Sequence, residues 1–287
     1  MRILLDGRKH IASYAVIKSL SDERMLYYKE YVLDKGKDWV VFVHGAGGSS
    51  SVWYRQIKDF KQHFNVLLVD LRGHGRSREL LKEYVESDFS FRDVAADILE
   101  VLDHLEILQA HFVGVSMGSI IIRSIGELAP ERLKSMVLCG AITRLNVRSR
   151  FLVFFGHCMK RFVPYMWLYK FFAWVIMPSK RDAFSRNLFV REARRLYKQE
   201  FLRWYHLTYE VNPLLKYFKE KEIPVPALYV MGEHDYMFLP PVRQTVNLHQ
   251  HASLRVVADC GHVVNVEEPQ IFNELAVSFI SQHPVAG

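Results

Sequence analysis

Short, mostly apolar runs alternate with longer amphipathic segments along most of the chain. The amphipathic segments repeat their apolar residues at helical spacing, as Val94, Ile98, Val101 and Leu105 do. The short runs are typical of strands covered on both faces of a sheet. They predict eight strands: Ile11–Ile17, Met25–Leu33, Trp39–Val43, Asn65–Leu71, Ala110–Val115, Leu133–Ala141, Ala227–Met231 and Leu254–Ala258.

Most of the predicted helices fall between these strands. One ends at Phe60, and the others span Phe91–Leu105, Met117–Ala129, Pro240–Leu248 and Glu267–Ile280. Residues 21–24, Ser-Asp-Glu-Arg, are expected to form a hairpin turn between the first two strands. Strands that alternate with helices in this way indicate an α/β fold built on a doubly wound, mostly parallel eight-stranded sheet.

The alternation stops at Ile142 and resumes after Pro224 and Pro226. Residues 142–222 have helical periodicity throughout, with breaks at Pro164, Pro178 and Pro213. We interpret this segment as a helical cap inserted into the α/β domain. The predicted division is therefore a core domain of residues 1–141 and 223–287 and a cap subdomain of residues 142–222.

Charge and aromatic residues are concentrated in the predicted cap. The chain has 287 residues and a net charge of +7, and residues 142–222 hold 17 Lys and Arg against 6 Asp and Glu. They also hold 19 of the 38 aromatic residues. No nucleic-acid-binding motif accompanies this basic charge, so we expect no nucleic-acid partner.

Composition favours a cytoplasmic location. The three cysteines, Cys139, Cys158 and Cys260, have neither a pairing pattern nor metal-ligand spacing, which favours a reducing compartment. No window offers the roughly 18 uninterrupted apolar residues of a transmembrane helix. The first residues contain too short an apolar stretch for a secretory signal. No oligomeric state is predicted.

One motif lies at the junction of a predicted strand and a predicted helix. Residues 114–118 are Gly-Val-Ser-Met-Gly, which matches the pattern G-x-S-x-G. A serine at this junction occupies a sharp turn in which Gly114 and Gly118 permit close backbone approach. Ser116 is therefore the candidate nucleophile, with the free N–H groups of the helix N-terminus beside it.

Two later residues complete a candidate set for acyl transfer, which needs a base and an acid that orients the base. His262 follows the last predicted strand, and Asp235 follows the strand before it. All three residues come just after strand carboxyl ends, where open α/β sheets bind ligands. Other acids nearby are Asp259, Glu233 and Asp70, of which Asp70 is expected to brace the loop that contains Arg72.

With these motifs together, the chain resembles the α/β-hydrolase superfamily, in its cap-bearing serine hydrolase branch. The matching motifs are His44-Gly45-Ala46-Gly47-Gly48, Asp70 to Ser77, Gly114 to Gly118, Gly232 to Asp235, and Gly261-His262 followed by Glu268-Pro269. The resemblance implies a catalytic triad of Ser116, Asp235 and His262. It also implies an oxyanion hole made by the backbone N–H groups of Ala46 and Met117, with Gly47 as an alternative donor. His44 is expected to be a hydrogen-bonding loop residue, and Cys260 a small packed one.

The aromatic first half of the predicted cap allows three interpretations. Its side chains pack the cap onto the core, or line a pocket for an acyl or aromatic group, or lie against a membrane surface. We prefer packing for most of them and keep membrane contact as an alternative. Four basic residues on a predicted helix form a solvated face or attract an anionic substrate: Arg191, Arg194, Arg195 and Lys198.

Three functions remain open. The first is hydrolysis of a carboxylic ester, lactone or thioester, with a hydrophobic or anionic small molecule as substrate, through an acyl-serine intermediate. The second uses the same triad to cleave a carbon–carbon bond, or for a lyase-like step, in an anionic substrate. The third is a hydrolase-like ligand receptor or signalling protein. No cofactor or metal is expected, because the Asp70–Ser77 loop lacks the G-x-G-x-x-G pattern and no residues have metal-ligand spacing.

Overall fold

The computed structural model describes residues 25–78, 90–160, 162–196 and 198–284. Within these ranges the chain forms a seven-stranded sheet in the order β1-β3-β2-β4-β5-β6-β7. Only β1 runs antiparallel to its neighbour, β3. The strands are β1 (Tyr28–Tyr31), β2 (Trp39–Val43), β3 (Asn65–Val69), β4 (Ala110–Val115), β5 (Leu133–Cys139), β6 (Ala227–Gly232) and β7 (Ala252–Val257).

This arrangement confirms the predicted α/β fold and its mostly parallel sheet. The candidate strand Ile11–Ile17 and the expected turn at residues 21–24 lie outside the described residues. The strand predicted over Met25–Leu33 is shorter in the structure, because the N–H groups of Leu33 and Asp34 donate to the side chain of Asn65 instead of extending the ladder.

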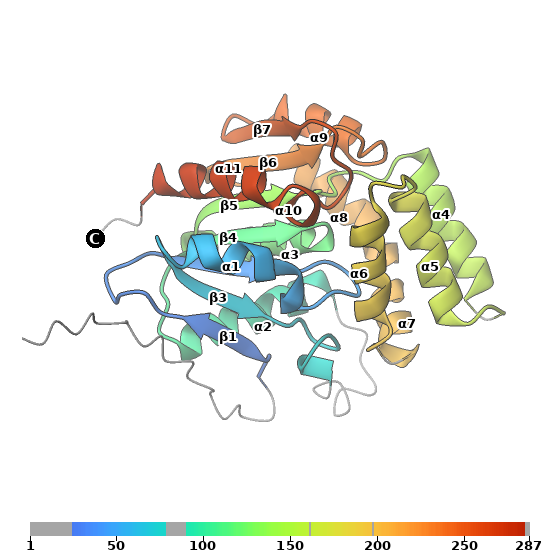
Figure 1. Cartoon of the computed structure of the whole chain (residues 1–287), viewed down its shortest axis with the longest axis horizontal. Helices are drawn as coiled ribbons and strands as arrows, with labels where there is room; N and C mark the ends of the chain where they lie inside the picture. Colours follow the sequence, from blue (N-terminus) through green and yellow to red (C-terminus); the bar gives the residue numbers. More distant parts are fainter. Residues whose placement is uncertain (1–24, 79–89, 161, 197, 285–287) are drawn as a thin grey trace, which may run out of the picture.

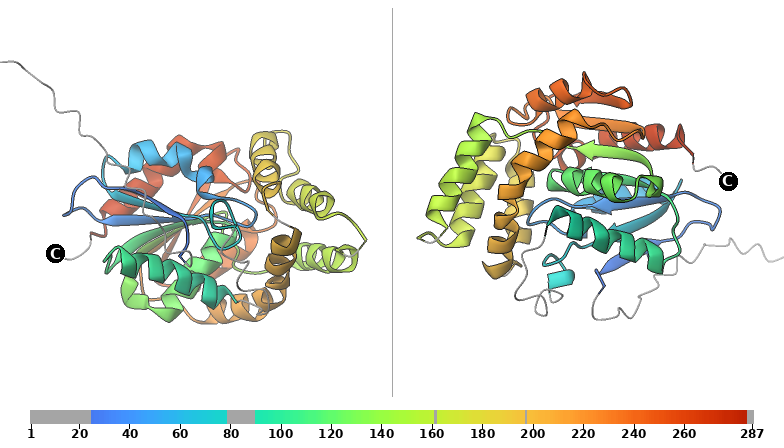
Figure 2. Two further views of the ribbon diagram at one scale, coloured as in Figure 1. Left: turned by 90° about the horizontal axis from the view of Figure 1, so that it is seen from below. Right: turned by 180° about the vertical axis from the view of Figure 1, so that it is seen from behind.

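Helices cover both faces of the sheet (Figures 1 and 2). One face packs against α2 (Phe91–His104) and α3 (Met117–Leu128), and the other against α1 (Tyr54–Phe60) and α11 (Pro269–Ser281). Successive β2 side chains point to opposite faces, so Val41 and Val43 belong to one core and Val40 and Phe42 to the other. The remaining short elements are η1 (Ser50–Trp53), η3 (Pro130–Arg132), α9 (Leu239–Val246) and α10 (Val264–Glu267).

Residues 142–222 form a helical segment between β5 and β6. Its helices are α4 (Val147–Met159), α5 (Tyr165–Ile176), α6 (Ala183–Ala193), α7 (Lys198–His206) and α8 (Thr208–Glu220). Figure 1 shows α4 to α7 beyond the carboxyl ends of the parallel strands. In α8, the Phe218 carbonyl accepts a hydrogen bond from Arg123 of α3. The last helix of the segment therefore contacts one of the helices that cover the sheet. No helix among the described residues is both long and apolar enough to cross a membrane.

Candidate active site

Ser116 lies in the turn between β4 and α3 with a strained backbone, φ 54° and ψ −117°. Its N–H donates to the carbonyl of Cys139 over 2.9 Å, and its own carbonyl accepts the Ser119 hydroxyl over 2.6 Å. The turn requires glycine at position 118, since a Cβ there would lie 2.3 Å from the Val43 carbonyl oxygen. The half-buried Ser116 hydroxyl is thereby held at the carboxyl edge of the sheet.

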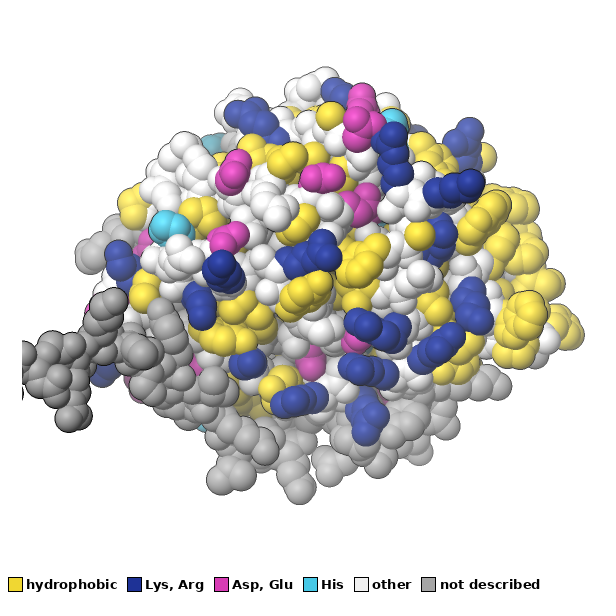
Figure 3. Space-filling view, in the orientation of Figure 1, with side chains coloured by type: hydrophobic (Ala, Val, Ile, Leu, Met, Phe, Trp, Pro, Cys, Tyr) yellow, Lys and Arg dark blue, Asp and Glu magenta, His cyan; other side chains and the backbone are white. Residues whose placement is uncertain are grey.

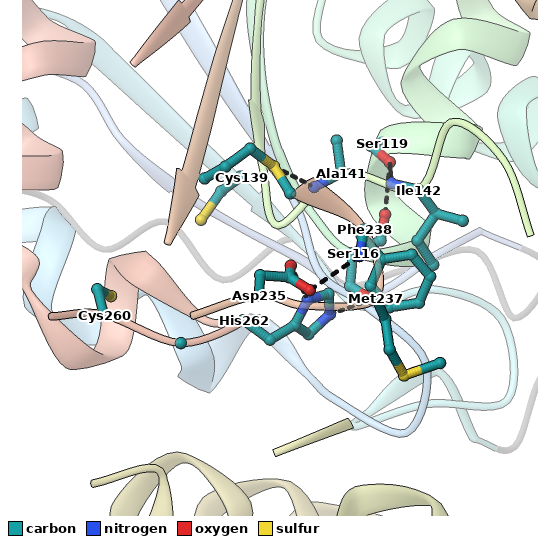
Figure 4. Close-up of polar contacts among 12 residues, drawn as sticks. Ser116, Ser119, Cys139, Ala141, Ile142, Asp235, Met237, Phe238, Cys260 and His262 are labelled. Carbon is teal, nitrogen blue, oxygen red and sulfur yellow. Dashed lines mark hydrogen bonds and ion pairs between the residues drawn. The ribbon is translucent and has the colours of Figure 1, made fainter. Parts of the chain in front are cut away.

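The structure brings His262 and Asp235 to this serine (Figure 4). The Nε2 atom of His262 lies 3.1 Å from Ser116 Oγ, and its Nδ1 atom lies 2.7 Å from Asp235 Oδ2. Asp235 Oδ1 accepts the N–H of Phe238 over 3.1 Å, which orients the carboxylate. Asp235 and His262 are 1% and 3% exposed, so bulk water is kept from their contact. A carboxylate, imidazole and hydroxyl connected in this order can pass a proton from serine to histidine.

Close backbone approach at Gly140 permits this placement of His262. A Cβ at Gly140 would lie 2.2 Å from the His262 carbonyl oxygen and 3.2 Å from the imidazole. Gly140 also has φ +50°, which favours glycine. The ring of Phe238 packs against the imidazole with centroids 5.1 Å apart. The histidine is therefore held between the turn after β5 and the loop after β6.

The other candidate carboxylates have different partners. Asp70 accepts the N–H groups of Ser50 and Arg76 over 2.6 and 2.9 Å, so it braces the loop containing Arg72, as predicted. Asp259 is exposed and pairs with Arg181. Glu233 accepts the N–H of Asp259 over 3.1 Å. Among the described carboxylates, Asp235 alone hydrogen-bonds to His262.

Ala46 and Met117 border the cavity that contains Ser116. Within the described residues, neither of their backbone N–H groups donates a hydrogen bond. The N–H of Gly47, in contrast, donates to His74 Nε2 over 2.9 Å. Gly47 is therefore occupied as a donor, whereas the N–H groups of Ala46 and Met117 are free in the described part of the chain.

Two buried histidines support the loop at residues 44–48. His74 donates from Nδ1 to the Arg72 carbonyl, and His44 donates from Nδ1 to the Gly45 carbonyl while its Nε2 accepts the Leu71 N–H. Burial lowers the pKa of His44 to about 4 and that of His74 to about 3. Both imidazoles are thus neutral near pH 7, which keeps Nε2 an acceptor. His44 has the predicted role of a hydrogen-bonding loop residue. The sequence analysis did not single out His74; its position between two glycines in the loop after β3 is the feature that could have identified it.

Comparison with known proteins identifies the fold. A family model described as the alpha/beta hydrolase fold matches residues 38–166. The chain is 28% identical over 268 residues to a putative carbamate hydrolase, RutD, of Acinetobacter baylyi, which covers 86% of this chain and 94% of that protein. The crystal structure of an enol-lactonase from Burkholderia xenovorans LB400 matches with a TM-score of 0.72 at 22% identity, over 89% of this chain and 96% of the other. This chain has the α/β-hydrolase fold.

A second curated relative, 3-oxoadipate enol-lactonase 2 of Acinetobacter baylyi, is 24% identical over 250 residues, or 82% of this chain and 85% of that protein. With its fold and its hydrolase relatives, the protein is an enzyme of the hydrolase class. The family model includes Ser116 and ends inside the helical segment. Asp235 and His262 lie beyond it in sequence, and the fold brings them to the serine.

The α/β hydrolase has an apolar cavity of about 250 Å³ above Ser116 and His262. The helical segment supplies much of its wall, through side chains such as Leu152, Phe172, Ala173, Ile176 and Phe201. No Asp, Glu, Lys or Arg side chain lines it within the described residues. The cavity can therefore take an apolar group next to the serine hydroxyl.

The described basic residues that could attract an anionic substrate do not line the cavity. Arg191, Arg194 and Arg195 are exposed, and Arg191 and Arg195 flank the buried Glu192. The side chain of Lys198 lies outside the described part of the chain. The aromatic residues of the segment divide between two places: Tyr169, Phe172, Phe189 and Phe201 border the cavity, whereas others are exposed.

Two further expectations concern metals and cysteines. Among the described residues, no three His, Cys, Asp or Glu side chains form a group that could hold a metal ion. Cys260 is buried in the core, as predicted, and burial raises the pKa of its thiol. Cys139, also buried, has its thiol pKa raised to about 12 by the same cause.

Proposed function

We propose that this enzyme hydrolyses a carboxylic ester, lactone or thioester with an uncharged apolar acyl group through an acyl-Ser116 intermediate. The observation that carries the proposal is the unbroken series of contacts from Asp235 through His262 to Ser116 at the base of an apolar cavity. The curated relatives include proteins named as a putative carbamate hydrolase and an enol-lactonase, which support a carbonyl substrate.

In this mechanism, His262 Nε2 takes the proton of the Ser116 hydroxyl as its oxygen attacks the substrate carbonyl carbon. Asp235 holds the Nδ1–H tautomer of His262 and stabilises the charged imidazolium. The N–H groups of Ala46 and Met117 stabilise the oxyanion, each contributing about 3–4 kcal/mol to the barrier reduction. His262 then returns the proton to the leaving group, and a water molecule, activated by the same histidine, hydrolyses the acyl-serine.

The helical segment of residues 142–222 acts in this proposal as a cap that selects the acyl group. Its inner residues enclose the cavity, and none of those that the structure describes is charged. An anionic substrate for carbon–carbon cleavage would need a cationic partner there to offset its desolvation. The cavity therefore favours the ester, lactone or thioester over the carbon–carbon alternative.

The test combines active-site labelling with turnover. A fluorophosphonate, followed by intact mass, should add one label per chain, and Ser116→Ala should abolish both the labelling and ester hydrolysis. Ser124→Ala, in the same helix, removes a hydroxyl that donates to the Ile120 carbonyl; it is the matched control and should retain both. p-Nitrophenyl butyrate and octanoate should be better substrates than the acetate.

Two other outcomes would overturn the proposal. Full ester hydrolysis by Ser116→Ala would remove the serine from the mechanism. Labelling of Ser116 without turnover of any ester, lactone or thioester, together with cleavage of a diketone, would favour carbon–carbon hydrolysis.

A further inference from the structure

The outer faces of α4 and α5 expose large apolar side chains in regular stripes. In α4, Val147, Phe151 and Phe154 recur at a spacing of four and then three residues, and all are at least 65% exposed. In α5, Trp167, Phe171 and Trp174 repeat the same spacing. Residues three or four apart share one face of a helix, so each helix presents one continuous apolar stripe outward.

The two stripes form one surface. Phe155 stacks on Phe151 with centroids 6.5 Å apart and contacts Phe171 at 5.3 Å, which joins the helices side by side. Phe162, in the connection between them, is 80% exposed. Figure 3 shows the hydrophobic side chains gathered at the end of the molecule where α4 and α5 lie. We call this the aromatic face; its members are Val147, Phe151, Phe154, Phe162, Trp167, Phe171 and Trp174. Soluble proteins rarely expose so many large apolar groups together without a partner.

The charge around the aromatic face has one sign. From Ile142 to Arg181 the sequence contains eight Lys and Arg and no Asp or Glu. Arg144, Arg150 and Lys170 are exposed, and no described carboxylate forms an ion pair with any of them. Lys and Arg side chains border the yellow surface in Figure 3. A partner for this face is therefore anionic at its periphery and apolar at its centre.

We propose that the aromatic face docks on the surface of an anionic lipid bilayer. Tryptophan and phenylalanine side chains insert at the boundary between headgroups and acyl chains, and lysine and arginine remain at the anionic headgroups. A dimer formed through this face would place two basic surfaces against each other, each without Asp or Glu between Ile142 and Arg181, and like-charge repulsion opposes that arrangement. The inner faces of the same helices line the cavity, so docking also places the cavity wall next to the acyl layer.

Vesicle binding tests the proposal. The full chain is mixed with phosphatidylcholine vesicles, or with vesicles in which about a third of the lipid is phosphatidylglycerol, and the bound fraction is measured by flotation. We expect partition to the anionic vesicles to exceed that to the neutral ones at least about tenfold, and to fall at least about fivefold in high salt. Trp167 and Trp174 are the two exposed tryptophans among the described residues, so brominated lipid should quench their fluorescence.

The variants separate this surface from the rest of the protein. Phe162→Ser/Trp167→Ser/Trp174→Ser should lower anionic-vesicle partition at least about tenfold. The control Leu108→Ser/Leu248→Ser removes two exposed apolar side chains from other parts of the surface and should bind like the parent. Ser116→Ala should also bind normally, so the docking test stands whether or not the proposed chemistry is correct.

Three results would overturn the proposal. One is no binding to anionic vesicles. Another is equal binding by the parent and the aromatic-face variant. The third is a dimer in light scattering that the triple substitution dissociates, which would assign the face to a second copy of the chain.

Discussion

His74 Nε2 accepts a hydrogen bond from the backbone N–H of Gly47 over 2.9 Å, and this contact orients the loop that carries Ala46. The loop is held on its other side by the Tyr169 hydroxyl, which donates to the Ala46 carbonyl over 3.0 Å. Ala46 is thus fixed between the buried His74 imidazole, in the loop after β3, and Tyr169 of α5. The N–H of Ala46 is an oxyanion donor in the proposed mechanism, and such a donor must be held in place before reaction to be effective. These two contacts hold the residue in place.

Removing the acceptor at His74 should reduce catalysis. His74→Phe keeps a flat ring but leaves the Gly47 N–H without a partner, so we expect kcat to fall about 10- to 100-fold with KM nearly unchanged. His74→Gln places an oxygen near the former Nε2 position and should recover part of the loss. Kinetics on p-nitrophenyl butyrate measure both variants, and a wild-type kcat for His74→Phe would contradict the role of this contact.

Asp235→Asn should disable the proposed triad while keeping a side chain of nearly the same size at this position. The amide cannot stabilise the His262 imidazolium and favours the wrong tautomer, so kcat should fall about 10³- to 10⁴-fold. Asp259→Asn is the control, because this nearby acid is exposed and pairs with Arg181. It should change kcat less than about twofold, as expected for an exposed ion pair. Comparable losses in the two variants would show that the acid has been assigned wrongly.

Filling the cavity should shorten the preferred acyl chain. Ala173 lies in α5 with its side chain on the cavity wall, so Ala173→Phe takes part of the roughly 250 Å³ available. We expect kcat/KM for the octanoate ester to fall at least about tenfold relative to the acetate ester. Asn187→Phe adds the same ring at an exposed position of α6 and should leave the ratio unchanged. An unchanged ratio in Ala173→Phe would place the acyl group outside this cavity.

Stability should depend on pH through the buried histidines. The pKa values of His44 and His74 are lowered from 6.5 to about 4 and about 3, because burial disfavours their charged forms. The unfolded chain binds their protons below about pH 6.5 and the folded chain does not, so the free energy of unfolding falls as the pH drops from there towards 4. Each histidine contributes up to about 1.4 kcal/mol per pH unit in that range.

Urea unfolding between pH 4.5 and 7.5 measures this dependence. His74→Gln should show a slope smaller by about one proton, whatever its absolute stability. An identical slope in the parent and the variant would mean that His74 takes up its proton equally in both states.

Local patterns were sufficient for much of this protein. Apolar runs predicted the mostly parallel sheet, because strands that are buried on both faces are apolar along their length. Helical periodicity predicted the helical segment at residues 142–222, because a helix that is buried on one face repeats its apolar residues every three or four positions. The turn at Ser116 was likewise predictable, since two glycines and a serine between a strand and a helix satisfy its steric needs within five residues. Strand ends were less accurate, as at Leu33, where a side chain distant in sequence captures the backbone.

Tertiary structure decided the questions that depend on residues far apart in the chain. Asp235 differs from Asp259 and Glu233 only in what it touches, and its contact with His262 exists because β6 and β7 are neighbours in the sheet. His74 accepts the N–H of Gly47 although the two residues lie 27 positions apart in the sequence. The aromatic residues of the helical segment divide into cavity wall and exposed face according to how α4 and α5 pack against the sheet and its helices. Helical periodicity reveals that a helix has two faces, but only packing determines which one turns to the protein and which to the solvent.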